Sequence, residues 1–203
     1  MARFVVRMGI AALAVVGALT VLGAGTASAT KLCTVEGLTK TCPAGQEVKA
    51  TAALKFSLKM PAQFSIKIAL VECQTSSFEG EVTNAGGGAG VPVKATLKNL
   101  AFGKCNNNCS VTPMGSPWSA TFEGSGNRDG DMTWSPSLEF NCNGTKCFYS
   151  DLVKFAVKGG FPATLEPGPE LTMTGGDKGC ANPGSWSGDY SITTPMDLWV
   201  TEK

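Results

Sequence analysis

Residues 71–105 read VECQTSSFEGEVTNAGGGAGVPVKATLKNLAFGKC, and this stretch decides the fold. Apolar and polar residues alternate over positions 78–83 and again over positions 93–98, which is the period of a half-buried strand. The segment 84–90 between them is too rich in glycine for regular structure and suits a loop. The pattern therefore predicts an antiparallel β-hairpin.

The apolar period of the second strand slips by one residue near Asn99, as a β-bulge at that position would cause. With the bulge in place, Glu79 faces Lys98 and could form a cross-strand ion pair with it. The same register brings Cys73 opposite Cys105. A disulfide would then close the base of the hairpin.

The cysteine count is eight, an even number, which predicts a disulfide framework in an exported protein. Four consecutive pairs each bracket a turn signal at their midpoint. This spacing favours the bridges Cys33–Cys42, Cys73–Cys105, Cys109–Cys142 and Cys147–Cys180. The alternative pairing joins Cys142 to Cys147 and leaves Cys109 for Cys180. A four-thiolate zinc site is a further alternative, but export favours disulfides.

The segment from Met1 to Ala29 has the features of a secretory signal peptide. Arg3 and Arg7 supply a positive start, an apolar run extends from Met8 to about Gly25, and Ala27-Ser28-Ala29 fits the small-x-small cleavage site. The run is also close to the length of a membrane anchor, which is the alternative. Cleavage after Ala29 predicts a secreted, extracellular protein with no membrane contact once the signal is removed.

Removal of the segment 1–29 leaves residues 30–203, which are predicted to form a single domain. Without Arg3 and Arg7 the 17 basic residues become 15, against 16 acidic ones, so the net charge is −1. This charge balance lacks the excess of basic residues that is typical of nucleic-acid-binding proteins. Histidine is absent, which excludes Ser-His-Asp triads and histidine metal sites. No cofactor is expected.

Turn residues recur every ~8–12 positions between segments rich in Val, Thr, Phe and Ser, which predicts an all-β fold. Many short strands must stack or close to protect their edges. The expected architecture is an antiparallel two-sheet sandwich, with a flattened β-barrel as the alternative, stapled by disulfides. The predicted strands are 47–58, 64–72, 76–83, 93–102, 110–112, 118–123, 132–140, 147–157, 170–174, 185–193 and 198–201.

One segment resembles a metal site. Asn127, Asp129 and Asp131 have the i, i+2, i+4 spacing of a calcium loop. Asp129-Gly130 is also a strong signal for a hairpin turn, and Leu138 stands where an EF-hand has its bidentate glutamate. The sequence favours a turn over a metal site.

The four tryptophans could form an aromatic platform for sugars or fill the core. Trp118 and Trp186 stand near the starts of predicted strands, where partial exposure is expected, and are the candidate ligand-binding residues. Packing in the interior is the alternative for both.

Two further activities have sequence features that would suit them. A secreted glycoside hydrolase needs paired carboxylates, although none here lies in a recognisable motif. A secreted protease inhibitor needs a rigid loop, and residues 112–117 (TPMGSP) carry two prolines close to a cysteine. The candidate carboxylates are Glu72, Glu79, Glu81, Glu123, Glu139 and Asp151.

Asn108-Cys109-Ser110 and Asn143-Gly144-Thr145 match the glycosylation acceptor pattern.

Five short motifs are spread over the chain: Cys42-Pro43-Ala44-Gly45, Val71-Glu72-Cys73-x₃-Ser77, Leu100-Ala101-Phe102 before Cys105, Pro117-Trp118-Ser119-Ala120 and Trp186-Ser187-Gly188-Asp189-Tyr190. In these motifs the chain resembles a group of uncharacterised secreted proteins of actinobacteria, over nearly the whole of residues 30–203. The resemblance implies an exported bacterial β-protein without an established activity, and no catalytic residue follows from it. The expected function is extracellular binding or a role in the envelope, with an envelope polymer or another extracellular protein as partner.

Overall fold

The computed structural model describes residues 29–35, 42–88, 90–168 and 170–202. This part of the chain folds as strands and connecting turns without a helix, which confirms the all-β prediction. It therefore holds no helix capable of crossing a membrane. The predicted signal peptide, apart from its last residue Ala29, lies outside the described residues.

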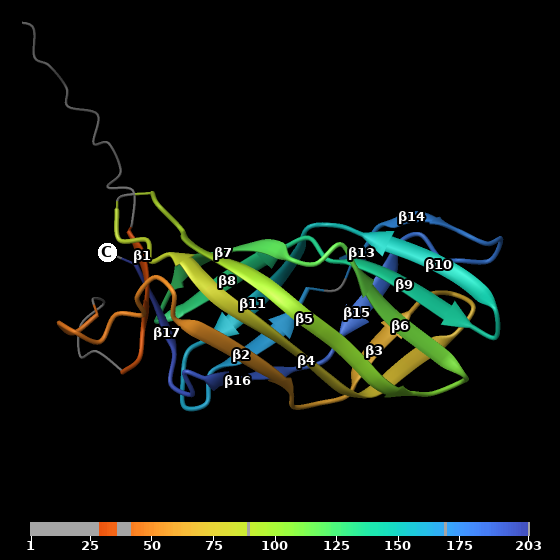
Figure 1. Ribbon diagram of the computed structural model, residues 1–203, viewed down its shortest axis with the longest axis horizontal. Coiled ribbons are helices and arrows are strands. Elements are labelled where there is room, and N and C mark those ends of the chain that lie inside the picture. Colours follow the sequence, from red (N-terminus) through yellow and green to blue (C-terminus); the bar gives the residue numbers. More distant parts are fainter. Residues whose placement is uncertain (1–28, 36–41, 89, 169, 203) are drawn as a thin grey trace, which may run out of the picture.

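The largest sheet closes into an eight-stranded antiparallel barrel (Figure 1), because β4 pairs with β2 along one edge and with β5 along the other. Around the ring the order is β4-β2-β16-β12-β11-β8-β7-β5. These strands are β2 (Ala53–Leu58), β4 (Leu70–Asn84), β5 (Val93–Cys105), β7 (Trp118–Gly126), β8 (Asp129–Trp134), β11 (Val153–Lys158), β12 (Thr164–Pro167) and β16 (Tyr190–Thr194).

Beyond the barrel the same sheet continues from β4 into β3, β15 and β13, and a second sheet of four strands covers this extension. Phe64 of the extension packs on Phe140 of the covering sheet, with ring centroids 5.0 Å apart. The molecule thus combines the two expected architectures, a barrel and a two-sheet sandwich. The sandwich strands are β3 (Ala62–Ser65), β15 (Gly184–Ser187) and β13 (Glu170–Leu171), facing β14 (Met173–Gly176), β10 (Thr145–Ser150), β9 (Ser137–Cys142) and β6 (Cys109–Met114).

A two-stranded ribbon, β1 (Thr30–Cys33) with β17 (Trp199–Glu202), lies at the opposite end of the molecule (Figure 1). Leu32 and Val200 of this ribbon are buried. Val200 lies so close to Gly130 of β8 that a Cβ on the glycine would meet it at 2.7 Å. We call this ribbon, together with the loop 159–163 between β11 and β12 and the loop 195–198 between β16 and β17, the cap. The sequence did not predict β1.

The central hairpin is confirmed, and so is its bulge. The register between β4 and β5 shifts at Asn99, which has a φ of 57°. Glu79 lies opposite Lys98, as predicted. The expected ion pair is wrong, however, because the Glu79 carboxylate lies 3.8 Å from the Lys55 ammonium and accepts a hydrogen bond from the Asn99 amide at 2.9 Å.

All eight cysteines form the four predicted disulfides. Cys109 pairs with Cys142 across β6 and β9, while the chain between them forms the barrel hairpin β7–β8. Cys147–Cys180 likewise joins the ends of a segment that contains the barrel hairpin β11–β12. The alternative that joined Cys142 to Cys147 is therefore wrong.

Several predicted strands are wrong in extent, because each contains a break that the apolar pattern does not reveal. In three of them one half belongs to the barrel and the other half to the sandwich, and only a short segment separates the two halves. The predicted strands 132–140, 147–157 and 185–193 break at residues 135–136, 151–152 and 188–189, and the strand 64–72 contains a turn at 66–69.

Strand β4 belongs to both cores. Val71 and Cys73 are buried, but further along the strand the buried residues are Ser76 and Phe78. Since successive residues of a strand point to opposite faces, β4 gives one face to the sandwich core and the other to the barrel. Phe78 stacks inside the barrel on Phe56, with ring centroids 4.2 Å apart.

Candidate functional site

The two tryptophans predicted to bind a ligand lie in the interior. Trp118 is 7% exposed, and its indole N–H donates to the carbonyl of Met114 at 3.1 Å. Trp186 is 0% exposed and lies between Phe64 and Trp134, with centroids 5.4 and 6.4 Å away. Trp186 thus packs where the two cores meet. The prediction of partial exposure is wrong, and neither ring can offer a face to a ligand at the described surface.

The proposed calcium residues lie on the β7–β8 hairpin. Asn127 and Arg128 have φ values of 55° and 68°, as a two-residue type I′ turn requires, so the hairpin is confirmed. Its turn lies two residues before the predicted Asp129-Gly130, which belongs to β8. The carboxylate of Asp129 accepts a hydrogen bond from the backbone N–H of Gly159 at 2.9 Å. Asp131 pairs with Lys154 at 2.9 Å. Within the described residues no cluster of metal-ligating side chains is present.

The candidate carboxylates of a hydrolase are all partly or fully exposed. Asp151 lines a depression of about 350 Å³ together with Glu170, a carboxylate that the sequence did not single out. The hydrogen bonds from the hydroxyl of Thr172 and the backbone N–H of Leu152 lower the pKa of Asp151. A general acid needs a raised pKa, so this carboxyl has the opposite tendency.

The segment proposed as an inhibitor loop is mostly strand. Residues 112–114 belong to β6, where Pro113 lies opposite Leu138 of β9. Only residues 115–117 connect β6 to β7, with a cis peptide bond before Pro117. A connection of this length offers an attacking protease little extended backbone, and an ordinary strand connection describes it well.

A recess lies at the disulfide-rich end of the molecule, which we call the tip. The β3–β4, β5–β6 and β9–β10 turns meet there, and hydrogen bonds join them to one another or to the segment 177–181 that follows β14. Asn107 in the β5–β6 turn donates its side-chain amide to the carbonyl of Leu70 at 3.0 Å, and its neighbour Asn106 accepts from the backbone N–H of Glu72 at 2.9 Å. The carbonyl of Ile66 accepts from the backbone N–H of Ala181 at 3.2 Å.

The β9–β10 turn is the third part of the tip. Asn143 and Gly144 have φ values of 53° and 89°, which again fits a type I′ turn. The backbone N–H of Gly144 donates to the side chain of Asn141 at 3.1 Å. Beside this turn, the backbone N–H of Lys146 donates to Asp177 at 2.7 Å. Three of the four disulfides also lie in this part of the molecule, so the tip is covalently fastened.

Tyr149 supports the tip from inside. Its ring is 0% exposed, and its hydroxyl donates to the carbonyl of Ala181 at 2.9 Å. Burial raises the pKa of Tyr149, and the hydrogen bond to Ala181 opposes this in part. The neutral phenol therefore persists at physiological pH and anchors the segment that follows β14 to β10.

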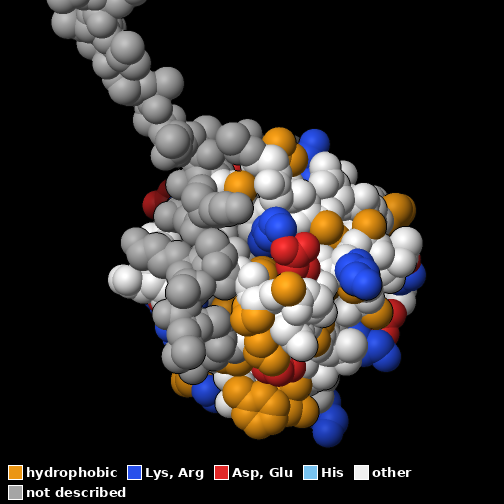
Figure 2. Space-filling model, turned by 90° about the vertical axis from the view of Figure 1, so that its left-hand side faces the viewer, with side chains coloured by type: hydrophobic (Ala, Val, Ile, Leu, Met, Phe, Trp, Pro, Cys, Tyr) orange, Lys and Arg blue, Asp and Glu red, His pale blue; other side chains and the backbone are white. Residues whose placement is uncertain are grey.

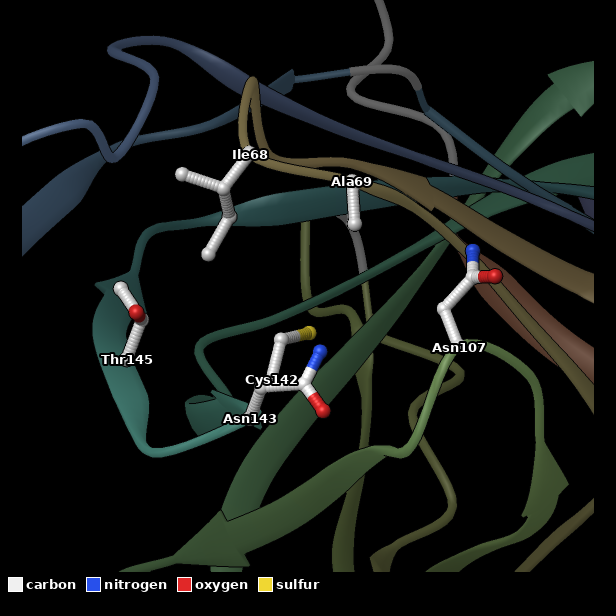
Figure 3. Close-up of a pocket in the computed structure, with 6 residues that line it drawn as sticks. All are labelled: Ile68, Ala69, Asn107, Cys142, Asn143 and Thr145. Atoms are coloured by element: carbon white, nitrogen blue, oxygen red, sulfur yellow. The ribbon is translucent and has the colours of Figure 1, made fainter.

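A recess of about 340 Å³ opens between these turns (Figure 3). Figure 3 shows the side chains of Ile68 and Thr145 on one side of the recess and Asn143 and Asn107 on the other. No described residue of the lining is charged. The residues that line it are Ile68, Ala69, Asn107, Cys142, Asn143 and Thr145.

The chemistry of this recess is neutral and mixed. Asn143 and Thr145 make no side-chain hydrogen bond to any described residue, so an amide and a hydroxyl are free to bind a ligand. Ile68 and Ala69 add an apolar surface. A small-molecule site combines such an apolar wall with a few convergent polar groups, and this volume is at the lower end of its usual range of roughly 300–1,000 Å³.

Sequence reasoning missed this recess. The Asn143-Gly144-Thr145 motif by itself indicates only a glycosylation acceptor, and the apolar pattern predicts a strand over Ile68 and Ala69. The local signal for the turns was present in Asn-Gly and in the asparagine run 106–108. Their convergence could not be read, because it depends on how β6 and β9 leave the barrel.

Comparison with known proteins gives no relative from which a role could be transferred: no family model, no curated protein and no solved structure matches this chain.

Proposed function

We propose that this protein is an exported binding protein of the cell envelope or extracellular space, and that the recess at its tip takes a neutral, hydroxyl-rich ligand such as a sugar unit of an envelope polymer. The observation that carries the proposal is the uncharged recess with the free amide of Asn143 and the free hydroxyl of Thr145 beside Ile68 and Ala69. Sugars bind through this combination of neutral hydrogen bonds and contact with apolar side chains.

Export is supported by two independent features. The segment from Met1 to Ala29 has the charge, apolar run and cleavage motif of a signal peptide. The four disulfides are compatible with an extracellular protein, because such bridges persist in oxidising compartments. N-terminal sequencing of the protein recovered from culture medium tests this part, and Thr30 is the expected first residue.

Rigidity favours binding over catalysis. The turns that surround the recess are held by disulfides and by side-chain hydrogen bonds, which lowers the entropy lost when a ligand is bound. The recess contains no carboxylate, thiol or charged group that could act as nucleophile or general acid among its described residues. A preformed neutral site of this kind suits recognition.

The test is retention on insoluble envelope polysaccharide and binding to a glycan array. Asn143→Gly and Thr145→Val should weaken binding about tenfold each, since each removes a polar group from a site built to use it. Glycine tolerates the positive φ of residue 143, and valine fits a strand, so both variants should fold.

Matched controls come from the barrel end. Asn127→Gly makes the same replacement in a turn with nearly the same φ, 55° against 53°, and Thr83→Val does so for an exposed threonine of β4. Equal loss of binding in the controls, or full binding in both tip variants, would show that the recess is not the site.

A further inference from the structure

We infer that the cap is a membrane-contacting surface, through which the exported protein rests on a lipid bilayer. This site is separate from the recess at the tip and does not depend on the function proposed for it. The sequence alone predicts no membrane contact once the signal peptide has gone, and the exposed side chains of the cap change that expectation.

Apolar side chains protrude from two neighbouring loops of the cap. Phe161, between β11 and β12, is 72% exposed, and Met196, between β16 and β17, is 47% exposed. The loops are joined by hydrogen bonds from the backbone N–H of Ala163 to the carbonyl of Met196 and from that of Gly160 to the carbonyl of Leu198. Figure 2, which looks onto this end, shows apolar side chains gathered in the lower half of the face.

The register of these loops places Trp199 beside Gly159. Gly160 pairs with Leu198, so Gly159 lies opposite Trp199, and a Cβ on Gly159 would meet the Trp199 ring at 2.7 Å. Leu198 is buried, and its neighbour Trp199 therefore points outward. Phe161 follows Gly160 directly, in the turn before β12, and its side chain is exposed. Trp199 is only partly buried, in contrast to the other three tryptophans.

The chemistry of this surface suits a bilayer better than a sugar. Phenylalanine and methionine tips offer no hydrogen bond, whereas a sugar site needs polar groups that converge on the ring. An amphipathic tryptophan behind protruding apolar side chains is the composition found at membrane–water interfaces. A second copy of this chain is also a poor fit, because a stable dimer buries roughly 800 Å² per partner, far more than two protruding side chains supply.

The connection of the chain gives a second argument. Thr30, which opens β1, lies in the cap, and Ala29 comes directly before it. The apolar run from Met8 to about Gly25 ends only a few residues before them. While that run is held in a bilayer during export, the cap is the part of the folded protein tethered closest to the lipid. Its exposed side chains then meet the membrane first.

The experiment measures binding of the purified exported protein to phosphatidylcholine vesicles by cosedimentation. Phe161→Ser with Met196→Ser should weaken partitioning at least about tenfold, because transfer of a phenylalanine side chain out of an apolar phase alone accounts for that factor. The control Met60→Ser with Leu152→Ser changes residues that are 55% and 65% exposed outside the cap, and it should leave partitioning unchanged.

A second readout locates the contact. Bromine-labelled lipid quenches only tryptophan close to the acyl chains, and Trp199 is the tryptophan at the surface of the described chain. Quenching should occur with the unaltered protein and disappear in Trp199→Phe. Absence of cosedimentation, equal loss in the control variant, or quenching that survives in Trp199→Phe would each overturn the proposal. So would a concentration-dependent dimer abolished by the Phe161 and Met196 changes without any vesicle binding.

Discussion

Removal of the Cys109–Cys142 disulfide by replacing both residues with alanine should destabilise the protein more than removal of Cys33–Cys42. The longer bridge closes a loop with a sequence separation of 33, and the shorter one a loop of 9. In the chain-entropy model, loops of these lengths restrict the unfolded chain by about 12.5 and about 8.7 cal/mol/K, which corresponds to about 3.7 and about 2.6 kcal/mol at 25 °C.

The assay is thermal and urea unfolding under non-reducing conditions, for both double variants and the unaltered protein. A domain of this size loses about 2–4 °C of Tm for each kcal/mol, so the two double variants should melt roughly 7–15 °C and roughly 5–10 °C lower. Cys33, Cys109 and Cys142 are all buried, so alanine also leaves small cavities in both double variants.

The reasoning would be refuted by the reverse order of the two losses. It would equally be refuted if the Cys109→Ala, Cys142→Ala protein melted within about 2 °C of the unaltered protein, since loop closure then could not be the source of stability. A change in the urea m-value alone would point instead to an altered unfolded state.

The remaining predictions concern buried contacts. Burial raises the pKa of Tyr190 far above its ordinary value, so the folded state retains the phenol proton. The free energy of unfolding should therefore be constant below pH about 10 and fall above it. Tyr190→Phe should make this fall less steep, as measured by urea unfolding at a series of pH values. The hydroxyls of Ser76 and Tyr190 lie 3.0 Å apart in the interior, and Ser76→Ala should cost about 1–3 kcal/mol in urea unfolding, whereas the double change with Tyr190→Phe should cost less than the sum of the single ones. Gly130→Ala should lower Tm by several degrees, because the new methyl would lie 2.7 Å from Val200 of the cap and 2.5 Å from the carbonyl oxygen of Glu123. An unchanged Tm would mean that the cap is not packed on β8. Trp118→Phe should reduce stability and leave polysaccharide retention intact, and the opposite pattern would restore the aromatic platform.

The sequence predicted what local chemistry determines. The period-two pattern and the glycines of segment 84–90 set the central hairpin, and the slip at Asn99 set its register. The Asp129-Gly130 signal placed the β7–β8 hairpin correctly, although its two turn residues are Asn127 and Arg128. The disulfides Cys73–Cys105 and Cys109–Cys142 followed, because antiparallel pairing about a turn brings positions equidistant from it together.

What the sequence could not show is where a continuous apolar pattern changes partner. Nothing in the period-two signal over 132–140 distinguishes one long strand from β8 followed by β9 in another sheet. The exposure of Trp118 and Trp186 depended on the same information, since both are buried by strands from distant parts of the chain. The tip recess was hidden for that reason as well: Ile68, Asn107 and Asn143 meet only through tertiary packing.

The crossover of β4 from one core to the other has a consequence for how the molecule yields to stress. Val71 and Phe78 are carried by one uninterrupted strand and lie in different cores. No hinge or linker separates the barrel from the sandwich in the described chain. If either half opened, β4 would lose the packing on one of its faces, and β4 also bounds the core of the other half. Unfolding should therefore occur as a single event rather than half by half. A ligand bound in the recess at the tip would therefore also stabilise the barrel and the cap against unfolding, because all parts of the molecule share one unfolding equilibrium and the ligand shifts it by mass action.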